Sequence, residues 1–210
     1  GTDEITINGV DDLTESIFTI PADRIEAGTY LIAAAVTYGD IVIQDINANR
    51  MNNILDKLKL SGALIETNEN SISLSMPHDS IHPVDISTAP FPGFPTDMQA
   101  QFTVLNALSN GSAVVTENVF ENRFMHVQEL NRMGCDITVK GSNAFIKGVN
   151  HLTGAPVMAT DLRASASLIL AGLCADGETI VDRIYHIDRG YERIEEKLSY
   201  LGADITRLPG

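Results

Sequence analysis

The sequence of 210 residues has no tryptophan, only two cysteines, and 14 lysines and arginines against 28 aspartates and glutamates. The resulting net charge of -14 argues against nucleic acid and anionic membranes as partners, because binding a phosphate backbone requires clustered Lys and Arg. No apolar run reaches the roughly 20 residues of a membrane span, and the N-terminus lacks the basic and apolar regions of a signal peptide. We therefore expect a cytoplasmic protein that binds neither nucleic acid nor membrane.

The scarce metal-binding residue types are poorly placed for chemistry. Cys135 and Cys174 lie in apolar surroundings, which favours two free structural thiols over a disulfide in a cytosolic chain. His78 and His82 have helical metal-ligand spacing, but flanking prolines predict a loop there instead. The sequence also lacks a phosphate-binding glycine loop, a Ser-His-Asp set and a zinc motif. We therefore expect no metal site and no cofactor.

Three apolar segments each begin at an aspartate. They are residues 23–37, 97–109 and 161–172, and each has apolar or small residues on nearly every helical face. An aspartate at a helix start can accept hydrogen bonds from the free backbone N–H groups there. A helix that is apolar all round is typical of a fully buried element. The pattern predicts three buried helices.

Two further features follow each of these segments in the same order: a strand leading to an arginine, and a glycine turn leading to another strand. The expected strands are 41–43, 113–115 and 179–181, the arginines are Arg50, Arg123 and Arg189, and the turns are 61–63, 133–135 and 201–203. Recurrence in one order, with a period of about seventy residues, indicates an internal triplication.

The repeats predict an α/β (α+β) architecture within one domain, residues 1–210. Each unit reads β-α-β-α-β-β, over about 14–76, 83–149 and 155–207. The first helix of each unit is apolar all round and the second has a one-sided apolar stripe, so we expect buried inner helices surrounded by sheets and outer amphipathic helices. The third unit ends one strand short. Residues 4–8 resemble the last strand of the second unit, and we expect them to pair with 204–206 and fill that position.

Arg123, Arg163 and Arg189 fall at expected helix N-termini, where a cation opposes the helix dipole at a cost of about 0.3–1 kcal/mol. A bound anion there would be stabilised by backbone N–H groups, the dipole and guanidinium groups together. The pattern predicts a shared carboxylate or phosphate site. The alternative is that each arginine pairs with a neighbouring acid, such as Asp161, Glu121 or Asp188. Arg50 holds the equivalent position in the first unit and is interpreted as structural.

Asp97 has two explanations. Thr96 and Gln99 form a capping-box pattern, so the carboxylate beside them can be a purely structural feature of the helix start. Alternatively, a carboxylate held at a helix end can act as a general base toward a substrate hydroxyl. Asp23, three residues before Glu26, also has a capping explanation.

Four strings at these positions resemble the bacterial UDP-N-acetylglucosamine enolpyruvyltransferases: residues 95–102, 117–127, 159–165 and 188–193. The resemblance covers essentially the whole chain. It implies transfer of enolpyruvate from phosphoenolpyruvate to the sugar 3'-hydroxyl, the first committed step of peptidoglycan synthesis. It also implies two inside-out α/β barrel domains of three units each, with the active site in the cleft between them. The chain is similar to one of those domains.

The resemblance also assigns roles to individual residues. Asp97 would be the carboxylate at the sugar hydroxyl and the base, and Arg189 would serve the carboxylate and phosphate of phosphoenolpyruvate. The implied catalytic residues are Asp97, Arg189, Asp161 and Glu121. The implied substrate-binding residues are Thr96, Asp97, Val119, Arg123, Arg163, Arg189 and Asp23, the last at the cleft rim.

The chain departs from this family in one large respect. The family's reactive loop cysteine, its N-terminal Lys-Asn pair and further arginines belong to an N-terminal half that has no counterpart here, and neither Cys135 nor Cys174 matches that cysteine. We therefore expect the missing half as a partner and no activity from this chain by itself. Two alternatives remain: a domain like 5-enolpyruvylshikimate-3-phosphate synthase, or a non-catalytic scaffold that retains part of a ligand surface.

Overall fold

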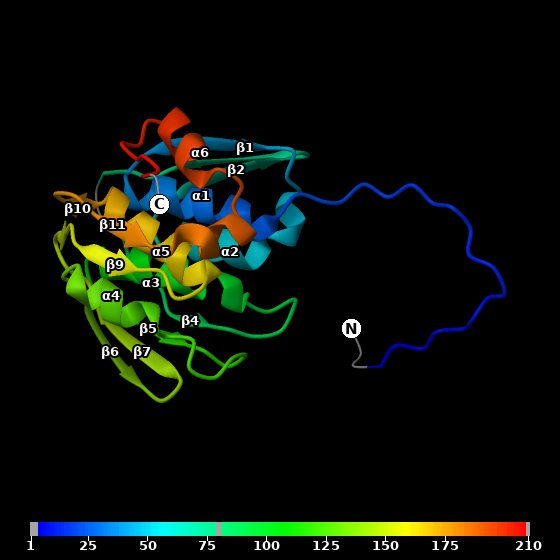
Figure 1. The fold of residues 1–210 in the computed structure, drawn as a ribbon, viewed down its shortest axis with the longest axis horizontal. Helices are drawn as coiled ribbons and strands as arrows, with labels where there is room; N and C mark the ends of the chain where they lie inside the picture. The colour runs from blue at the N-terminus through cyan, green and yellow to red at the C-terminus, as the bar shows by residue number, and fades with distance from the viewer. Residues whose placement is uncertain (1–3, 79–80, 209–210) are drawn as a thin grey trace.

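Three apolar helices lie at the centre of the computed structural model, which describes residues 4–78 and 81–208 (Figure 1). They are α1 (Arg24–Val36), α3 (Gln99–Ala107) and α5 (Leu162–Leu173). Every residue of α3 is buried, and the three helices pack against one another. A helix that is apolar on all sides is stable only when protein covers it all round. The prediction of three buried helices is confirmed.

Helices α1 and α5 begin at aspartates, as the sequence predicts. The Asp23 carboxylate accepts hydrogen bonds from the backbone N–H groups of Ile25 at 2.7 Å and Glu26 at 3.4 Å. The Asp161 carboxylate accepts in the same way from the backbone of Arg163 and of the residue after it. These bonds pair donors that have no partner inside the helix, so both carboxylates have a structural role.

Helix α3 begins differently. A short 3-10 turn, η2 (Thr96–Met98), precedes it, and no side chain caps either element. The expected capping box between Thr96 and Gln99 is therefore wrong, because the Thr96 hydroxyl binds side chains from other elements. Asp97 still lies in the first turn of η2, so a structural role at the helix start remains an alternative for it.

Two sheets lie on opposite sides of the central helices (Figure 1). One is antiparallel with the order β1-β3-β2, and the other has the order β4-β5-β7-β6, with β4 parallel to β5. Their strands are β1 (Asp40–Gln44), β2 (Leu64–Asn68), β3 (Ser71–Ser75), β4 (Ile86–Ser87), β5 (Ser112–Thr116), β6 (Asp136–Lys140) and β7 (Asn143–Lys147). Alternate side chains of β3 and β7 are buried against the helices, as expected for a strand with one covered face.

Shorter parallel pairs complete the strand arrangement beside α5. Strand β8 (Leu152–Thr153) pairs with β10 (Ala175–Asp176), and β9 (Pro156–Met158) pairs with β11 (Ile180–Asp182). The strands expected before the three arginines are thus confirmed as β1, β5 and β11, each within one residue of its expected bounds. The chain is a mixed α/β protein, as predicted.

Outer helices cover the remaining surface. They are α2 (Asn52–Leu60), α4 (His126–Arg132) and α6 (Ile194–Tyr200), with the 3-10 turns η1 (Ala48–Arg50) and η3 (Ile184–Arg189) before α2 and α6. Each outer helix buries one face only, as its apolar stripe predicts. Arg123 lies in the loop before α4, and Arg189 ends η3. Of the three arginines expected in a first helical turn, only Arg163 occupies one.

The expectation that residues 4–8 pair with 204–206 is wrong. Neither segment forms a strand, and residues 4–20 extend away from the fold without forming the first strand expected for the first unit (Figure 1). The side chains of Ile5 and Ile7 are 85% and 83% exposed. Alternating apolar residues make a segment suitable for a sheet, but a strand also needs a hydrogen-bonded neighbour, and 204–206 provide no strand edge.

Among the described residues, no helix is long and apolar enough to cross a membrane. Both cysteines are free. Burial raises the pKa of the Cys135 and Cys174 thiols to about 12 each. A thiol that stays protonated is a poor nucleophile, which fits the structural role expected for both. Among residues 4–78 and 81–208, no group of three or more His, Cys, Asp or Glu side chains is arranged to hold a metal ion.

Candidate active site

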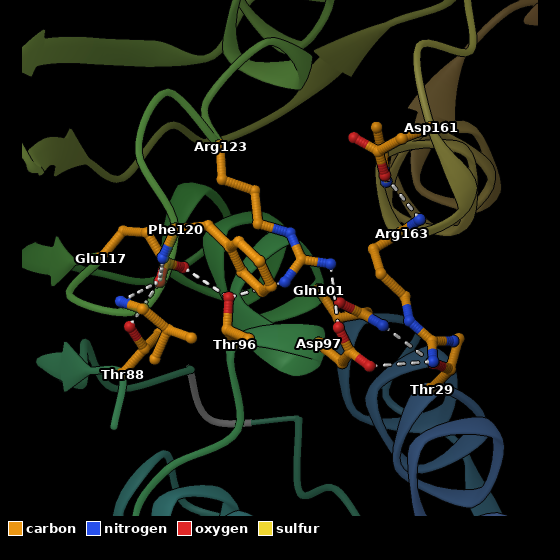
Figure 2. A network of polar contacts seen from close by, with 12 residues as sticks. Thr29, Thr88, Thr96, Asp97, Gln101, Glu117, Phe120, Arg123, Asp161 and Arg163 are labelled. Carbon is orange, nitrogen blue, oxygen red and sulfur yellow. Dashed lines mark hydrogen bonds and ion pairs between the residues drawn. The ribbon is translucent and has the colours of Figure 1, made fainter. Parts of the chain in front are cut away.

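Asp97 lies at the centre of a polar cluster where the N-terminal ends of α3 and α5 approach each other (Figure 2). Its Oδ1 is 2.8 Å from Nη2 of Arg123, and its Oδ2 is 3.2 Å from Nη2 of Arg163. The three residues are 26 and 66 positions apart in the sequence. Burial raises the pKa of Asp97, but the hydrogen bonds and charges of the two guanidinium groups outweigh it and lower that pKa below its usual value.

The lowered pKa has a consequence for stability. A carboxylate whose pKa is lower in the folded state stabilises the fold above its unfolded pKa of about 3.8, and that contribution is lost as the pH falls through the folded value. We therefore expect wild type to be more stable than Asp97→Asn at pH 6, and this difference to shrink as the pH falls below 3.8. Urea unfolding of both chains across this range measures it. A difference independent of pH would contradict the pairing.

Comparing two chains is necessary because His126 also titrates. Burial is the main cause that lowers the pKa of this histidine, to about 4. A buried neutral histidine costs stability as the pH falls from about 6.5 toward 4, since the unfolded chain takes up the proton first. Both chains carry His126, so its effect cancels in the difference.

Arg163 reaches from the first turn of α5 into a buried network. Its Nη1 donates to the hydroxyl of Tyr191 at 3.1 Å, and its guanidinium group lies over the Tyr191 ring, 5.5 Å from the centroid. The Tyr191 hydroxyl is also 2.9 Å from Oγ1 of Thr29, and Gln101 donates to both hydroxyls. Residues from α1, α3 and α5 thus meet at one tyrosine, which fixes the orientation of Arg163.

Tyr191→Phe should destabilise the fold through this network. The change keeps the buried ring but leaves one N–H of Arg163 and one of Gln101 without an acceptor and removes the hydroxyl that faces Thr29, at an expected cost of about 1–3 kcal/mol in unfolding free energy. Urea denaturation measures the cost. Tyr200→Phe is the matched control, because that side chain is 92% exposed and should change stability by less than about 0.5 kcal/mol. Equal effects of the two changes would contradict the network.

Arg123 is held from the other side of the cluster. Its Nη1 donates to Oγ1 of Thr96 at 2.7 Å, and the Thr96 hydroxyl donates in turn to Oε2 of Glu117 at 2.8 Å. The guanidinium group lies 5.0 Å from the centroid of the Phe120 ring (Figure 2). A guanidinium group has five N–H donors, and each of the two arginines uses two of them in these contacts. The remaining donors suit an anion such as a carboxylate or phosphate.

The structure brings together four of the expected site residues: Thr96, Asp97, Arg123 and Arg163. The alternative in which Arg123 and Arg163 pair with acids close to them in sequence is wrong, because both pair with Asp97. Asp188, the acid proposed for Arg189, instead pairs with Arg207 at 2.7 Å.

Other expected site residues lie apart from this cluster in their side-chain contacts. Arg189 and Glu121 are exposed and have no hydrogen-bond or ion-pair partner within the described part of the chain. The carboxylate of Asp161 caps α5, and only the backbone N–H of Val119 connects to the cluster, through Glu117. Asp23 lines a separate groove of about 640 Å³ between α1, β1 and α6.

Four residues of the cluster were missed by sequence reasoning: Glu117, Thr29, Gln101 and Tyr191. The pattern places Tyr191 in the apolar stripe of the last helix, and its ring is indeed fully buried. A usable signal was present for Thr29 and Gln101, which are polar residues within helices that are otherwise apolar on every face. Such residues need buried partners, and partners of buried polar groups often lie at functional sites.

A protein-family model described as EPSP synthase (3-phosphoshikimate 1-carboxyvinyltransferase) matches residues 1–198. The chain belongs to this family. One curated relative, UDP-N-acetylglucosamine 1-carboxyvinyltransferase of Coxiella burnetii, is 60% identical to this chain over 99% of its length. The enzyme of the same name from Hydrogenovibrio crunogenus is 59% identical over 98%. The chain spans about half the length of these relatives, 48% and 49%.

Solved structures of the family have the same fold. The enolpyruvyl transferase NikO from Streptomyces tendae matches 90% of this chain with a TM-score of 0.83 and 28% identity, and the match covers 45% of the NikO chain. An EPSP synthase from Acinetobacter baumannii matches 91% of this chain with a TM-score of 0.67, and the match covers 44% of that chain. At 18% identity, the second match supports the fold alone.

Proposed function

We propose that the chain is one domain of a UDP-N-acetylglucosamine 1-carboxyvinyltransferase, which moves enolpyruvate from phosphoenolpyruvate to the sugar 3'-hydroxyl of UDP-N-acetylglucosamine. The identity of 60% over nearly the whole chain to enzymes of that name carries this proposal. The cluster around Asp97 supports it, because the reaction needs a base for a hydroxyl and cations for a doubly anionic donor. The reaction is the first committed step of peptidoglycan synthesis, and we propose that the chain acts in the cytoplasm.

The chemistry assigns tasks to the cluster. The sugar 3'-oxygen forms a bond to the enol carbon of phosphoenolpyruvate, the hydroxyl proton leaves, and the carbon–oxygen bond to phosphate breaks, so that inorganic phosphate is released. Asp97 is placed to accept the hydroxyl proton. Arg123 and Arg163 present unused N–H donors toward a carboxylate or phosphate. Thr96 and Val119 would then line the sugar-nucleotide side of the site.

The remaining expected residues lie outside the Asp97 cluster, and the proposal gives each of them a role. Arg189 is exposed and has unused donors, so a cleft closed by a second domain would bring it against phosphoenolpyruvate. Glu121 is exposed on the loop before α4, where it could assist proton transfer across such a cleft, and Asp161 orients the first turn that carries Arg163. Asp23 would lie at the edge of the cleft.

We also propose that the elements form an inside-out barrel of three related units. The order of an inner helix, a strand, an outer helix and two strands occurs at α1-β1-α2-β2-β3 and at α3-β5-α4-β6-β7. The third unit shares the first part of this order, α5-β11-α6, with the short strand β10 inserted after α5. The missing half of the enzyme would form the second domain and supply the reactive cysteine, the Lys-Asn pair and further arginines.

The acceptor decides between this proposal and its alternative. The chain is mixed with the part of the Coxiella burnetii relative that it does not match, and phosphate release from phosphoenolpyruvate is measured with two acceptors. We expect release with UDP-N-acetylglucosamine and none above background with shikimate 3-phosphate. The opposite preference would favour the shikimate-pathway enzyme that gives the family its name.

A further inference from the structure

Glu117 is a buried carboxylate next to the cluster. It follows the last residue of β5, and its side chain is only 3% exposed. Four hydrogen bonds converge on it: from the hydroxyls of Thr88 at 2.7 Å and Thr96 at 2.8 Å, and from the backbone N–H groups of Val119 at 2.9 Å and Phe120 at 3.2 Å (Figure 2). Burying a carboxylate is costly unless several donors satisfy it. Four donors on one side chain indicate that its placement is specific.

The direction of these bonds matters for Arg123. An ionised carboxylate can only accept, so the single hydroxyl proton of Thr96 is committed to Oε2 of Glu117. The Thr96 oxygen then presents a lone pair to Nη1 of Arg123 at 2.7 Å, while Nη2 of the same guanidinium group meets Asp97 at 2.8 Å. Glu117 thus determines which way the hydroxyl faces, and the hydroxyl holds one end of the guanidinium fork.

We propose that Glu117 is a positioning residue of this site: through the Thr96 hydroxyl it fixes Arg123 in the orientation that meets Asp97, and through two backbone N–H groups it fixes the loop that carries Val119 and Phe120. The inference rests on the proposed function for the identity of the substrates. The hydrogen-bond relay itself does not depend on that identity. Glu117 touches no reacting atom in this role and acts only through its neighbours.

Glu117→Gln separates this role from plain stabilisation. The amide oxygen of glutamine can keep the three bonds now made to Oε1, from Thr88, Val119 and Phe120. The amide nitrogen, which replaces Oε2, is a donor and cannot accept the Thr96 proton. The loop should therefore stay in place while the relay to Arg123 loses its fixed direction.

The first measurement uses the chain without any substrate. Nitrogen NMR of the Arg123 guanidinium group should show distinct, slowly exchanging Nη signals in wild type and averaged signals in Glu117→Gln. Glu66→Gln is the matched control, because it makes the same charge change at an exposed position of β2 and should leave the signals unchanged. A folded Glu117→Gln chain with an unchanged Arg123 spectrum would overturn the proposal, whether or not the transferase assignment holds.

The second measurement uses the chain combined with its missing half. Glu117→Gln should lower kcat/KM for phosphoenolpyruvate by about 10- to 100-fold, the range expected for one lost hydrogen bond to a charged group, and Glu66→Gln should not change it. Unchanged kcat/KM in the presence of an altered Arg123 spectrum would also overturn the positioning role.

Thr96→Val tests the same relay by a second route, in case Glu117→Gln does not fold. It removes the hydroxyl but leaves the other three bonds of Glu117 in place, so it should produce the same averaged Arg123 signals. The double variant should be no worse than Thr96→Val alone, because both changes break one relay. Additive losses would show that the two residues act independently and would contradict the proposal.

Discussion

The purified 210-residue chain should release no phosphate from phosphoenolpyruvate in the presence of UDP-N-acetylglucosamine. Catalysis of this kind depends on charged groups held on every side of the transition state. The Asp97 cluster provides only one face of such a site. The chain also spans only about half the length of its enzymatic relatives. Adding the other half of the Coxiella burnetii relative should restore transfer, measured by phosphate release and by mass spectrometry of the enolpyruvyl product.

The control for this experiment is complementation with a chain that carries Asp97→Asn, which should leave the mixture nearly inactive. Enolpyruvyl transfer by the chain without its partner would refute the two-domain requirement. A mixture that assembles and binds both substrates but never reacts would favour the non-catalytic scaffold.

Asp97→Asn should lower kcat of the complemented enzyme by about 10²–10⁴-fold, the usual cost of losing a general base. Asparagine keeps a carbonyl oxygen that can accept from one arginine, so the KM for each substrate should change much less than kcat. Steady-state kinetics with both substrates varied measures the two effects separately. The expected pattern is therefore a fall in turnover with binding retained.

Asp56→Asn provides the matched comparison, because this exposed residue of α2 has no hydrogen-bond or ion-pair partner among the described residues. Turnover of that variant should equal wild type. Near-normal kcat in Asp97→Asn would return Asp97 to a structural role, in which it serves only to neutralise Arg123 and Arg163.

The role proposed for Asp97 raises a question of acidity. A carboxylate with a lowered pKa is a weak base as long as two guanidinium groups hold it. An anionic substrate that binds the unused donors of these groups would neutralise part of their charge. The carboxylate would then become a stronger base once the substrate is bound. The same two arginines would hold Asp97 ionised before binding and contact the anionic substrate afterwards.

The inner helices and their neighbouring strands were predictable because local pattern decides them. An unbroken apolar surface requires burial wherever the helix lies, and an aspartate at its start caps it without help from distant residues, as Asp23 and Asp161 do. The strands β1, β5 and β11 were also predictable from local pattern, because each is a short apolar segment at the same place in its repeat.

The centre of the site was only partly predictable, because its contacts join segments far apart in the chain. Sequence pattern identified Arg123, Arg163 and Asp97 as candidates, but it offered each arginine only its sequence neighbours as partners. The observed pairs depend on how α3 and α5 pack, which no single segment specifies. Tertiary packing likewise replaced the expected capping box at Thr96 by a 3-10 turn.

The apolar N-terminal segment has a consequence for the colloidal behaviour of the chain. Seven of its large side chains are exposed: Ile5, Ile7, Val10, Leu13, Ile17, Phe18 and Ile20. The net charge of -14 keeps molecules apart in dilute buffer. At physiological ionic strength the Debye length shrinks to about 8 Å, so this repulsion fades while the attraction between apolar segments persists. We therefore expect salt concentration to decide whether these molecules stay dispersed or associate through residues 5–20.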